Sequence, residues 1–351
     1  MASRRAVVRR VPASGPDDVS GVEALFEEGL DPASVVAVLG KTEGNGCVND
    51  FTRGYATRRF EDLFARHGAG GAAIVMSGGT EGALSPHWTV FAREEVDDEP
   101  EGALAIGVAR TAAVAAEALG RREHAEMVAD GVRRAMADAG VTDAADVHFV
   151  QVKCPLLTMA RTEAAEARGA TTATRDTLKS MGLSRGASAL GVAVALGEIE
   201  FDRLADDDVC GDYGLFSSCA SASSGVELLD NEIVVLGMSA AWSGPLAIDH
   251  AVMRDAIDVR SVAAVRERMG PGALVAALAK AEADPSGLVR GRRHTMLDDS
   301  DIASTRHARA FVGGALAGLF GETEIYVSGG AEHQGPPGGG PVAIILDRSG
   351  S

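Results

Sequence analysis

One pattern occurs three times along this chain of 351 residues. Each copy predicts a helix, a turn, an apolar strand that ends on a lysine, an arginine behind a small hydroxyl residue, and a Ser-x-Gly-x-Glu turn that leads into another strand. The lysines are Lys41, Lys153 and Lys280, the arginines are Arg53, Arg185 and Arg306, and the turn serines are Ser77, Ser223 and Ser328. Copies of one unit pack around a shared axis, because each alone buries too little apolar surface. We therefore expect three Lys/Arg/Ser sets to meet in one small cationic pocket, suited to a compact ligand with three similar faces.

The spacing of the copies predicts three fused units of α/β type. The repeat period of roughly 110–130 residues is too long for a solenoid, whose units run to about 50 residues. Helical and strand patterns alternate, which is typical of an α/β architecture. The acidic stretch 94–101 and the segment 242–249, where Gly244 and Pro245 break the pattern, indicate the boundaries. We predict units over residues 1–100, 101–245 and 246–351.

Hydrophobic periodicity predicts the individual elements. Apolar residues at helical spacing predict helices, and short apolar runs bounded by turn residues predict buried strands. The predicted helices are 19–28, 123–139 and 303–320, and the predicted strands are 35–39, 72–76, 147–152, 233–238, 325–327 and 342–346. Gly140 and Gly321 are the expected stops of the second and third helices.

The net charge of −17 limits the partners of this chain. Nucleic acids and anionic membranes require a basic surface, so we expect neither as a partner. Arginines cluster near the N-terminus, but no apolar signal-peptide core follows them. The longest apolar runs fall far short of the ~20 residues that cross a bilayer. We therefore predict a cytoplasmic protein.

The cysteines indicate neither a zinc site nor a disulfide framework. Cys47, Cys154, Cys210 and Cys219 form no CxxC pair, and no histidine pair stands at zinc spacing. Free thiols of a reducing compartment are expected. Cys154 directly follows Lys153 and is an alternative nucleophile, but it ranks behind the serines because no histidine shows a partnering signal.

The recurring residue types favour nucleophilic catalysis. Burial and neighbouring positive charge lower the pKa of a lysine amine, so a lysine at the end of an apolar strand can act as a base toward a serine. Backbone N–H groups of Ser-Gly turns can hold an oxyanion, and arginines can polarise carbonyl groups. Together these features predict attack on an amide or imide carbonyl of a small polar ring.

Two glycine-rich segments, 40–46 and 329–341, invite comparison with phosphate-binding loops. Neither contains the GxxxxGK[ST] signature or the strand–GxGxxG–helix arrangement, so nucleotide binding is not expected. The backbone carbonyls of the second segment, with Gln334, suit a hard cation such as Mg²⁺ or Ca²⁺, which prefers oxygen ligands.

Long strings spread over nearly the whole chain resemble the cyanuric acid hydrolase / barbiturase family of ring-opening amidohydrolases. These strings are GKTEGNGCVNDFTRGYA, VMSGGTEG, VQVKCPLLT, MGLSRGASALGVAVALGEI, SSCASASSGVELLDN, RGRRHTMLDDSDI, STRHARA and VSGGAEHQGPPGGGP. The resemblance implies three units around a pseudo-threefold axis, an active site on that axis, and a homotetramer.

The resemblance also implies hydrolytic opening of a cyclic imide without a catalytic cofactor. Cyanuric acid would give carboxybiuret, which loses CO₂ to form biuret, whereas barbituric acid would give ureidomalonate. Three similar binding faces favour cyanuric acid. Barbiturase is the alternative, since one side chain between Ser300 and Arg306 could decide between the rings. A non-catalytic imide-binding protein is the second alternative, and it would need no Lys–Ser pair.

Residue roles follow from the same resemblance. Lys153 is the base, and the nucleophile is Ser223 if the Ser-x-Gly-x-Glu turns are aligned or Ser224 if only the Ser-Gly dipeptide is. The third substrate arginine is Arg306 by the internal repeat or Arg309, one helical turn on. The other residues implied to bind substrate are Lys41, Arg53, Ser77, Gly78, Arg185, Lys280, Ser328 and Gly329. A structural Mg²⁺ or Ca²⁺ behind Ser328 would be held by Glu282 and by backbone groups of Ala331, Gln334, Gly335, Pro336 and Gly339.

Overall fold

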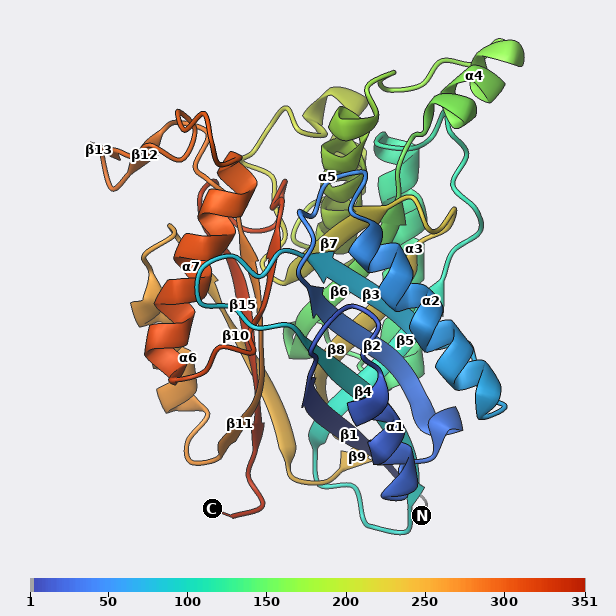
Figure 1. Ribbon diagram of the computed structural model, residues 1–351, viewed down its shortest axis with the longest axis vertical. Helices are drawn as coiled ribbons and strands as arrows, with labels where there is room; N and C mark the ends of the chain where they lie inside the picture. The colour runs from blue at the N-terminus through green and yellow to red at the C-terminus, as the bar shows by residue number, and fades with distance from the viewer. Residues whose placement is uncertain (1–2, 351) are drawn as a thin grey trace.

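The computed structural model describes residues 3–350; residues 1, 2 and 351, at the outer ends of the first and third predicted units, lie outside the description. Three large sheets surround the centre of the molecule (Figure 1). The first sheet contains β1 (Ser3–Pro12), β2 (Val35–Thr42), β3 (Ala73–Gly78) and β4 (His87–Val96), with β9 (Trp242–Ser243) at its edge. The second contains β5 (Ala103–Arg110), β6 (Val147–Pro155), β7 (Ala220–Gly225) and β8 (Glu232–Ser239). The third contains β10 (Leu246–Met253), β11 (Ala273–Ala281), β14 (Tyr326–Gly329) and β15 (Gly340–Asp347).

The three sheets share one strand topology. In each, the first strand is antiparallel to the fourth, the fourth is antiparallel to the second, and the second is parallel to the third. A parallel pair needs a long crossover, and in every sheet a helix provides it. The prediction of an α/β fold built from three similar units is therefore confirmed, whereas the exact limits of the units stay predictions.

Helices cover the outer faces of the sheets (Figure 1). The covering helices are α1 (Ser20–Glu27), α2 (Phe51–Arg66), α3 (Arg122–Ala139), α5 (Thr177–Ala195), α6 (Val259–Arg268) and α7 (Ser304–Phe320). Helix α4 (Met159–Ala167) projects away from the sheets (Figure 1). Four short 3-10 helices, η1 (Pro32–Ser34), η2 (Ala144–Asp146), η3 (Phe201–Arg203) and η4 (Asp206–Asp208), and a small hairpin of β12 (Leu288–Val289) and β13 (Arg292–Arg293) complete the list. The predicted helices and strands are confirmed, and Gly140 and Gly321 close α3 and α7 with φ of 67° and 66°.

The acidic segment 94–101 is only partly a linker. Its first residues belong to β4, where Glu94 and Glu95 pair with Arg5 and Arg4 of β1. Opposite charges on neighbouring strands favour this ladder, so the strand runs on past the point where composition alone suggested a break.

The second predicted boundary also contains a strand. Trp242 and Ser243 form β9, which lies parallel to β1 and pairs with Arg4 and Arg5. The indole N–H of Trp242 donates to the carbonyl of Ala139 at 2.7 Å. The chain thus leaves the second sheet by adding two residues to the edge of the first.

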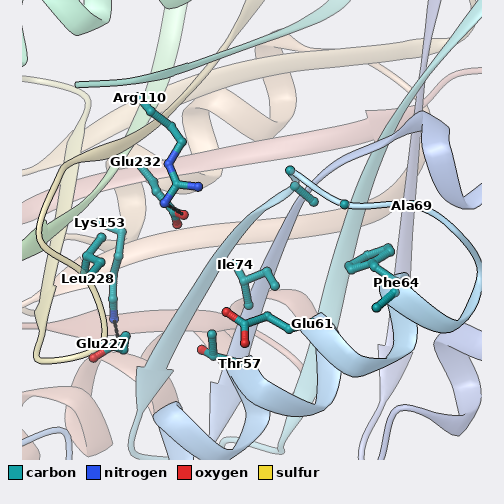
Figure 2. A pocket seen from close by; sticks show the side chains of 14 residues that line it. Thr57, Glu61, Phe64, Ala69, Ile74, Arg110, Lys153, Glu227, Leu228 and Glu232 are labelled. Atoms are coloured by element: carbon teal, nitrogen blue, oxygen red, sulfur yellow. Dashed lines mark ion pairs between the residues drawn. The ribbon is translucent and has the colours of Figure 1, made fainter. Parts of the chain in front are cut away.

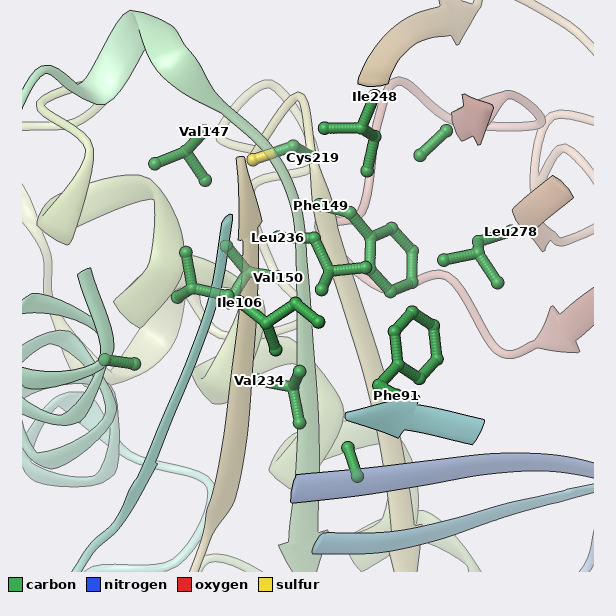
Figure 3. Packing of buried hydrophobic residues seen from close by; sticks show 14 of the residues in the cluster. Phe91, Ile106, Val147, Phe149, Val150, Cys219, Val234, Leu236, Ile248 and Leu278 are labelled. Carbon is green, nitrogen blue, oxygen red and sulfur yellow. The ribbon is translucent and has the colours of Figure 1, made fainter. Parts of the chain in front are cut away.

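The inner faces of the three sheets meet in one continuous apolar core. Phe91 of the first sheet, Phe149 and Leu236 of the second, and Ile248 and Leu278 of the third belong to a single buried cluster (Figure 3). Separate clusters lie between the sheets and their outer helices. Because each sheet is buried on both faces, a charged side chain on its central strands is removed from water.

Candidate active site

The lysine and serine of each copy face each other on neighbouring parallel strands. The register pairs Lys41 with Ser77 and Lys280 with Ser328. In the second sheet it pairs Lys153 with Ser223, while Ser224 pairs with the next residue along β6. The three lysines are at most 1% exposed. Structural equivalence among the copies therefore singles out Ser223 as the counterpart of the other two turn serines.

The three sets are linked in a ring through their lysines. Lys41 Nζ donates to the carbonyl oxygen of Val327 at 2.7 Å, and Lys153 Nζ donates to that of Met76 at 3.2 Å. Lys280 Nζ donates to the carbonyl oxygen of Ala222 at 3.0 Å, which closes the ring. Each acceptor is the residue just before the turn serine of the neighbouring sheet. Every lysine thus contacts the strand end of another copy, as expected for units around a pseudo-threefold axis.

The turn serines open onto one small pocket. Its lining brings together residues from all three sheets and from α2, α5 and α7. The lining residues are Gly46, Arg53, Ser77, Gly78, Met181, Arg185, Ser223, Ser224, Arg309, Ser328 and Gly329. The lysines lie behind the serines. Gly46 and Met181 carry no distinctive sequence signal and were not among the candidates.

Of the two candidate arginines on α7, Arg309 lines the pocket and Arg306 does not. Arg309 is 2% exposed, and its guanidinium donates to both carboxylate oxygens of Glu81 at 2.6 and 3.0 Å. Arg306 stands almost one turn nearer the start of α7, on a similar face of the helix, and it is half-buried where Arg309 is buried.

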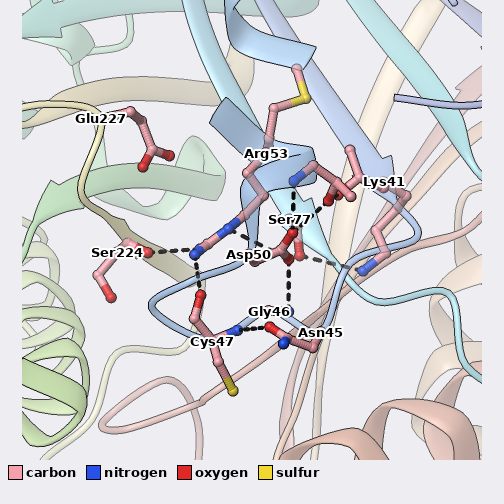
Figure 4. Close-up of polar contacts among 12 residues, drawn as sticks. Lys41, Asn45, Gly46, Cys47, Asp50, Arg53, Ser77, Ser224 and Glu227 are labelled. Carbon is pink, nitrogen blue, oxygen red and sulfur yellow. Dashed lines mark hydrogen bonds and ion pairs between the residues drawn. The ribbon is translucent and has the colours of Figure 1, made fainter. Parts of the chain in front are cut away.

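The other two arginines enter the pocket from α2 and α5. Arg53 Nη1 donates to the carbonyl of Ser224 at 2.9 Å (Figure 4). Arg185 donates to both carboxylate oxygens of Glu332 at 2.6 and 2.8 Å. Burial opposes the charge of Arg185, but the carboxylate of Glu332 outweighs it and raises the pKa of this arginine. The pocket therefore presents fixed guanidinium donors to a polar ligand.

The loop before α2 leaves no room for a side chain at Gly78. Asp50 caps α2 by accepting from the backbone N–H of Thr52 at 3.1 Å, and it also accepts from the N–H of Gly46 at 2.7 Å (Figure 4). A Cβ at Gly78 would lie 1.8 Å from a carboxylate oxygen of Asp50. Glycine after Ser77 thus lets this loop close over the pocket.

Burial sets the protonation of two of the lysines. It lowers the pKa of Lys41 well below its usual value, and the positive charge of Arg309 adds to the effect. Burial, with the charge of Arg185, lowers the pKa of Lys280 to about 7. Lys41 Nζ lies 3.3 Å from Ser77 Oγ, and Lys280 Nζ lies 3.0 Å from Ser328 Oγ. Burial therefore favours the neutral form of both amines while they contact a hydroxyl.

Lys153 has a different neighbour. Its Nζ lies 2.6 Å from a carboxylate oxygen of Glu227 (Figure 2). Burial raises the pKa of Glu227, but the charges of Lys153 and Arg53 outweigh it and lower that pKa to about 2. The carboxylate is therefore ionised, and Lys153 lies in contact with a negative charge.

Four of the six predicted metal ligands line a cavity of about 200 Å³. Glu282, Ala331, Gly335 and Pro336 line it, whereas Gly339 does not and its neighbour Gly338 does. The side chain of Gln334 points elsewhere, with Oε1 accepting from the N–H of Ala222 at 2.7 Å, so only its backbone is available.

The carboxylate of Glu282 fits a hard cation. Burial, with the negative charge of Glu332, raises the pKa of Glu282. Within residues 3–350, Glu282 forms no ion pair with a lysine, arginine or histidine. A buried carboxylate beside backbone carbonyls is the donor set that Mg²⁺ and Ca²⁺ prefer.

One further cluster of metal-ligand type lies away from the pocket. His148 of β6 lies near Asp249 and His250 of β10. The Nδ1 atoms of the two histidines are 3.0 Å apart, which fits one hydrogen bond between neutral rings, and burial lowers the pKa of His250 to about 4. Arg268 already pairs with Asp249. The cluster joins two sheets and plays no part in the pocket.

Comparison with known proteins identifies the family of this chain. The family model described as "amidohydrolase ring-opening protein" matches residues 7–347. This chain belongs to that family of ring-opening amidohydrolases. It is therefore a hydrolase that acts on C–N bonds of cyclic amides.

Individual relatives cover almost the whole chain. A cyanuric acid amidohydrolase of Rhizobium johnstonii is 71% identical over 99% of both chains, and one of a Bradyrhizobium strain is 63% identical over 99% of both chains. The crystal structure of a cyanuric acid hydrolase from A. caulinodans has a TM-score of 0.94 and 61% identity over 99% of both chains. A second cyanuric acid hydrolase structure, described in terms of structural concatenation, also has a TM-score of 0.94, with 50% identity over 98% of this chain and 100% of that one.

None of the helices described between residues 3 and 350 combines the length and the apolar character that a bilayer crossing requires.

Proposed function

We propose that this ring-opening amidohydrolase acts on cyanuric acid and opens its ring to carboxybiuret, which then loses CO₂ to form biuret. Three similar Lys/Ser/Arg sets around one pocket carry the proposal, because they match a ring with three chemically identical faces. The names of the similar proteins support the same substrate.

The proposed nucleophile is Ser223. Its Oγ attacks one ring carbonyl as the neutral amine of Lys153 accepts the hydroxyl proton. The ring C–N bond then breaks, and the ammonium of Lys153 donates that proton to the departing nitrogen. Water cleaves the resulting ester and releases the open chain. Ser223 is favoured over Ser224 because it is the register partner of Lys153.

The other two sets would bind the remaining faces of the ring. Ser77 and Ser328 present hydroxyl groups to ring carbonyls, and the amines of Lys41 and Lys280 lie behind them. Arginines donate from the side of the ring: Arg53, Arg185 and Arg309 all line the pocket. Such prearranged donors stabilise negative charge as it develops on the ring oxygens.

A cation at Glu282 would be structural. The cavity beside Glu282 lies behind the turn of Ser328, and its donors are one carboxylate and backbone carbonyls. Mg²⁺ or Ca²⁺ there would fix the 329–341 loop and supply no group to the reaction. We also propose a homotetramer that works in the cytoplasm, and size measurement with fractionation of cells would test both statements.

The deciding experiment is turnover of the purified protein on cyanuric acid and barbituric acid side by side, followed by loss of ring absorbance. Loss with cyanuric acid alone supports the proposal. Loss with barbituric acid alone replaces it with the barbiturase activity on the same site. Binding of either ring without turnover would make the chain a non-catalytic imide-binding protein.

A further inference from the structure

One carboxylate breaks the symmetry of the three sets. A glutamate stands four residues after each turn serine. Glu81 and Glu332 each pair with an arginine of the pocket at 2.6 Å. Glu227, the third, lies 2.6 Å from Lys153 instead, while Arg53 donates to two backbone carbonyls. The second lysine therefore has a partner for which the first and third copies show no equivalent.

The second turn has a different backbone shape. In the first and third turns, Gly79 and Gly330 have φ of +106° and +74°, and an arginine lies against each. Gly225, at the equivalent place, is not in that left-handed region, and a Cβ on it would lie 2.0 Å from the carboxylate of Glu227. Ser224 also replaces the glycine found in the other turns. The altered turn folds the carboxylate of Glu227 back toward the lysine.

A cavity of about 350 Å³ lies behind this ion pair (Figure 2). Lys153 and Glu227 line it, and none of its lining residues lines the axis pocket. The side chain of Lys153 is 1% exposed, whereas that of Glu227 is 16% exposed. The pair therefore stands between the serine of the axis pocket and a second, solvent-connected space.

Several charged groups face Glu227 around that cavity. They come from α2, β5, β6 and β8, and they are Arg53, Glu61, Arg110, Lys153 and Glu232. Arg110 and Glu232 neutralise each other at 2.9 Å. Within residues 3–350, Glu227 is the one carboxylate within 4 Å of the Lys153 amine. Removing it would leave a buried ammonium without a counter-charge.

We propose that Glu227 is a positioning residue that sets the protonation state of Lys153, and that the cavity connects this pair to solvent while substrate fills the axis pocket. The inference rests on the proposed function. At rest Lys153 is an ammonium. Its proton passes to the Glu227 carboxylate and then to water in the cavity, which leaves the neutral amine. That amine accepts the proton of Ser223 Oγ as the Oγ–C bond forms, and donates it to the ring nitrogen as the C–N bond breaks.

The pH profile of Glu227→Gln tests the first part. Loss of the counter-charge lets the neutral amine form at lower pH, so the acid limb of the kcat/KM profile should move down by about 1 to 3 pH units. Glu227→Asp should restore part of the shift. The matched control is Glu81→Gln, which should raise KM and leave the limb in place. A folded Glu227→Gln protein with an unmoved limb overturns the inference.

A second readout does not depend on turnover. Acetic anhydride labels only neutral amines, so the pH dependence of Lys153 acetylation, followed by mass spectrometry, should shift in the same direction in Glu227→Gln. Turnover without this shift overturns the role of Glu227 and leaves the proposed function standing. If the acetylation profile shifts in a protein that opens neither ring, the role of Glu227 is supported and the proposed function is overturned.

Filling the cavity tests the route to solvent. Ala72 lines the cavity, and Ala72→Phe should narrow it. At a fixed pH this variant should slow acetylation of Lys153 at least about tenfold, because the side chain is reached through the cavity. Ala69→Ser, at another lining position, adds little volume and is the control. Unchanged labelling of Lys153 in a folded Ala72→Phe protein would overturn the route.

Discussion

The first and second Lys/Ser sets have the same strand geometry but different neighbours around the lysine. Lys41 and Lys153 occupy equivalent positions on parallel strands, both face a turn serine in register, and both are buried. Lys41 contacts a hydroxyl and a carbonyl, and its pKa is strongly lowered by burial and by Arg309. Lys153 instead contacts the carboxylate of Glu227. Equal strand geometry therefore does not give equal surroundings, because a carboxylate contacts one of the two amines and not the other.

The largest expected effect separates the nucleophile from its counterparts. Ser223→Ala should lower kcat by about 10⁴-fold or more, because the covalent step is lost. Ser77→Ala, the equivalent change in the first set, should cost about 10- to 1000-fold, as expected for one stabilising donor. Steady-state kinetics on cyanuric acid measures both. Equal losses in the two variants would contradict the assignment.

Ser224→Ala sharpens the same comparison. Ser224 Oγ donates to the carbonyl of Met181 at 3.3 Å and faces the pocket, but it is out of register with Lys153. We expect this variant to keep its kcat within about tenfold of the parent, since it removes only this bond and a second long one, which Ser224 Oγ accepts from Arg185 Nη1 at 3.4 Å. A loss as large as that of Ser223→Ala would move the nucleophile to Ser224.

The arginines of α7 give the next effect. Arg309→Ala should raise KM by about 10- to 150-fold, because charged hydrogen bonds contribute about 1.5–3 kcal/mol. Arg306→Ala, the matched control on the same helix, should change KM by less than about threefold, since Arg306 lies outside the pocket lining. A larger rise of KM in Arg306→Ala than in Arg309→Ala would instead make Arg306, the choice of the repeat alignment, the third substrate arginine.

A smaller effect is expected on the thermal stability of the protein, through the cation proposed behind the third Lys/Ser set. Chelation of bound Mg²⁺ or Ca²⁺ should lower Tm of the parent protein by a few degrees, at about 1–2 °C per kcal/mol of lost binding energy for a chain of this length. Glu282→Gln should have the lower Tm from the start and should not respond to the chelator. Equal responses of both proteins would place any bound cation elsewhere.

The smallest effect is the pH dependence of stability. Burial lowers the pKa of Lys41 in the folded state, so above that lowered pKa and below about 10.5 the unfolded chain binds more protons on this side chain. The free energy of unfolding therefore gains from rising pH in that window. Between pH 7 and 9, the free energy of unfolding measured in urea should rise by about 1–2 kcal/mol less in Lys41→Met than in the parent protein. An unchanged slope would mean that Lys41 is charged when folded.

Sequence reasoning recovered the repeated strands because each carries a short apolar run that ends on a functional residue. It also recovered α3 and α7, whose glycine stops are true left-handed caps. It did not place α2 or α5, although both carry arginines of the pocket. α5 is buried on most of its surface, so its apolar residues show little helical periodicity.

The order of residue types along the chain predicts part of the site. The order lysine, arginine, serine brings together elements that line one pocket, but sequence order alone does not tell which arginine of α7 lines it, Arg306 or Arg309. The partner of Lys153 could not be predicted, since Glu81, Glu227 and Glu332 occupy the same place in their turns. The backbone follows a different path at Gly225, and this path turns Glu227 toward Lys153.

The ring of lysine-to-carbonyl bonds has an evolutionary consequence. No unit completes its own set, because each lysine needs a strand end from its neighbour. A single unit could therefore build such a site only as a homotrimer, and in a homotrimer every change is repeated three times. Joining the units in one chain removes that constraint. Gene fusion would thus allow one of three identical Lys/Ser sets to become catalytic while the other two continue to bind the substrate.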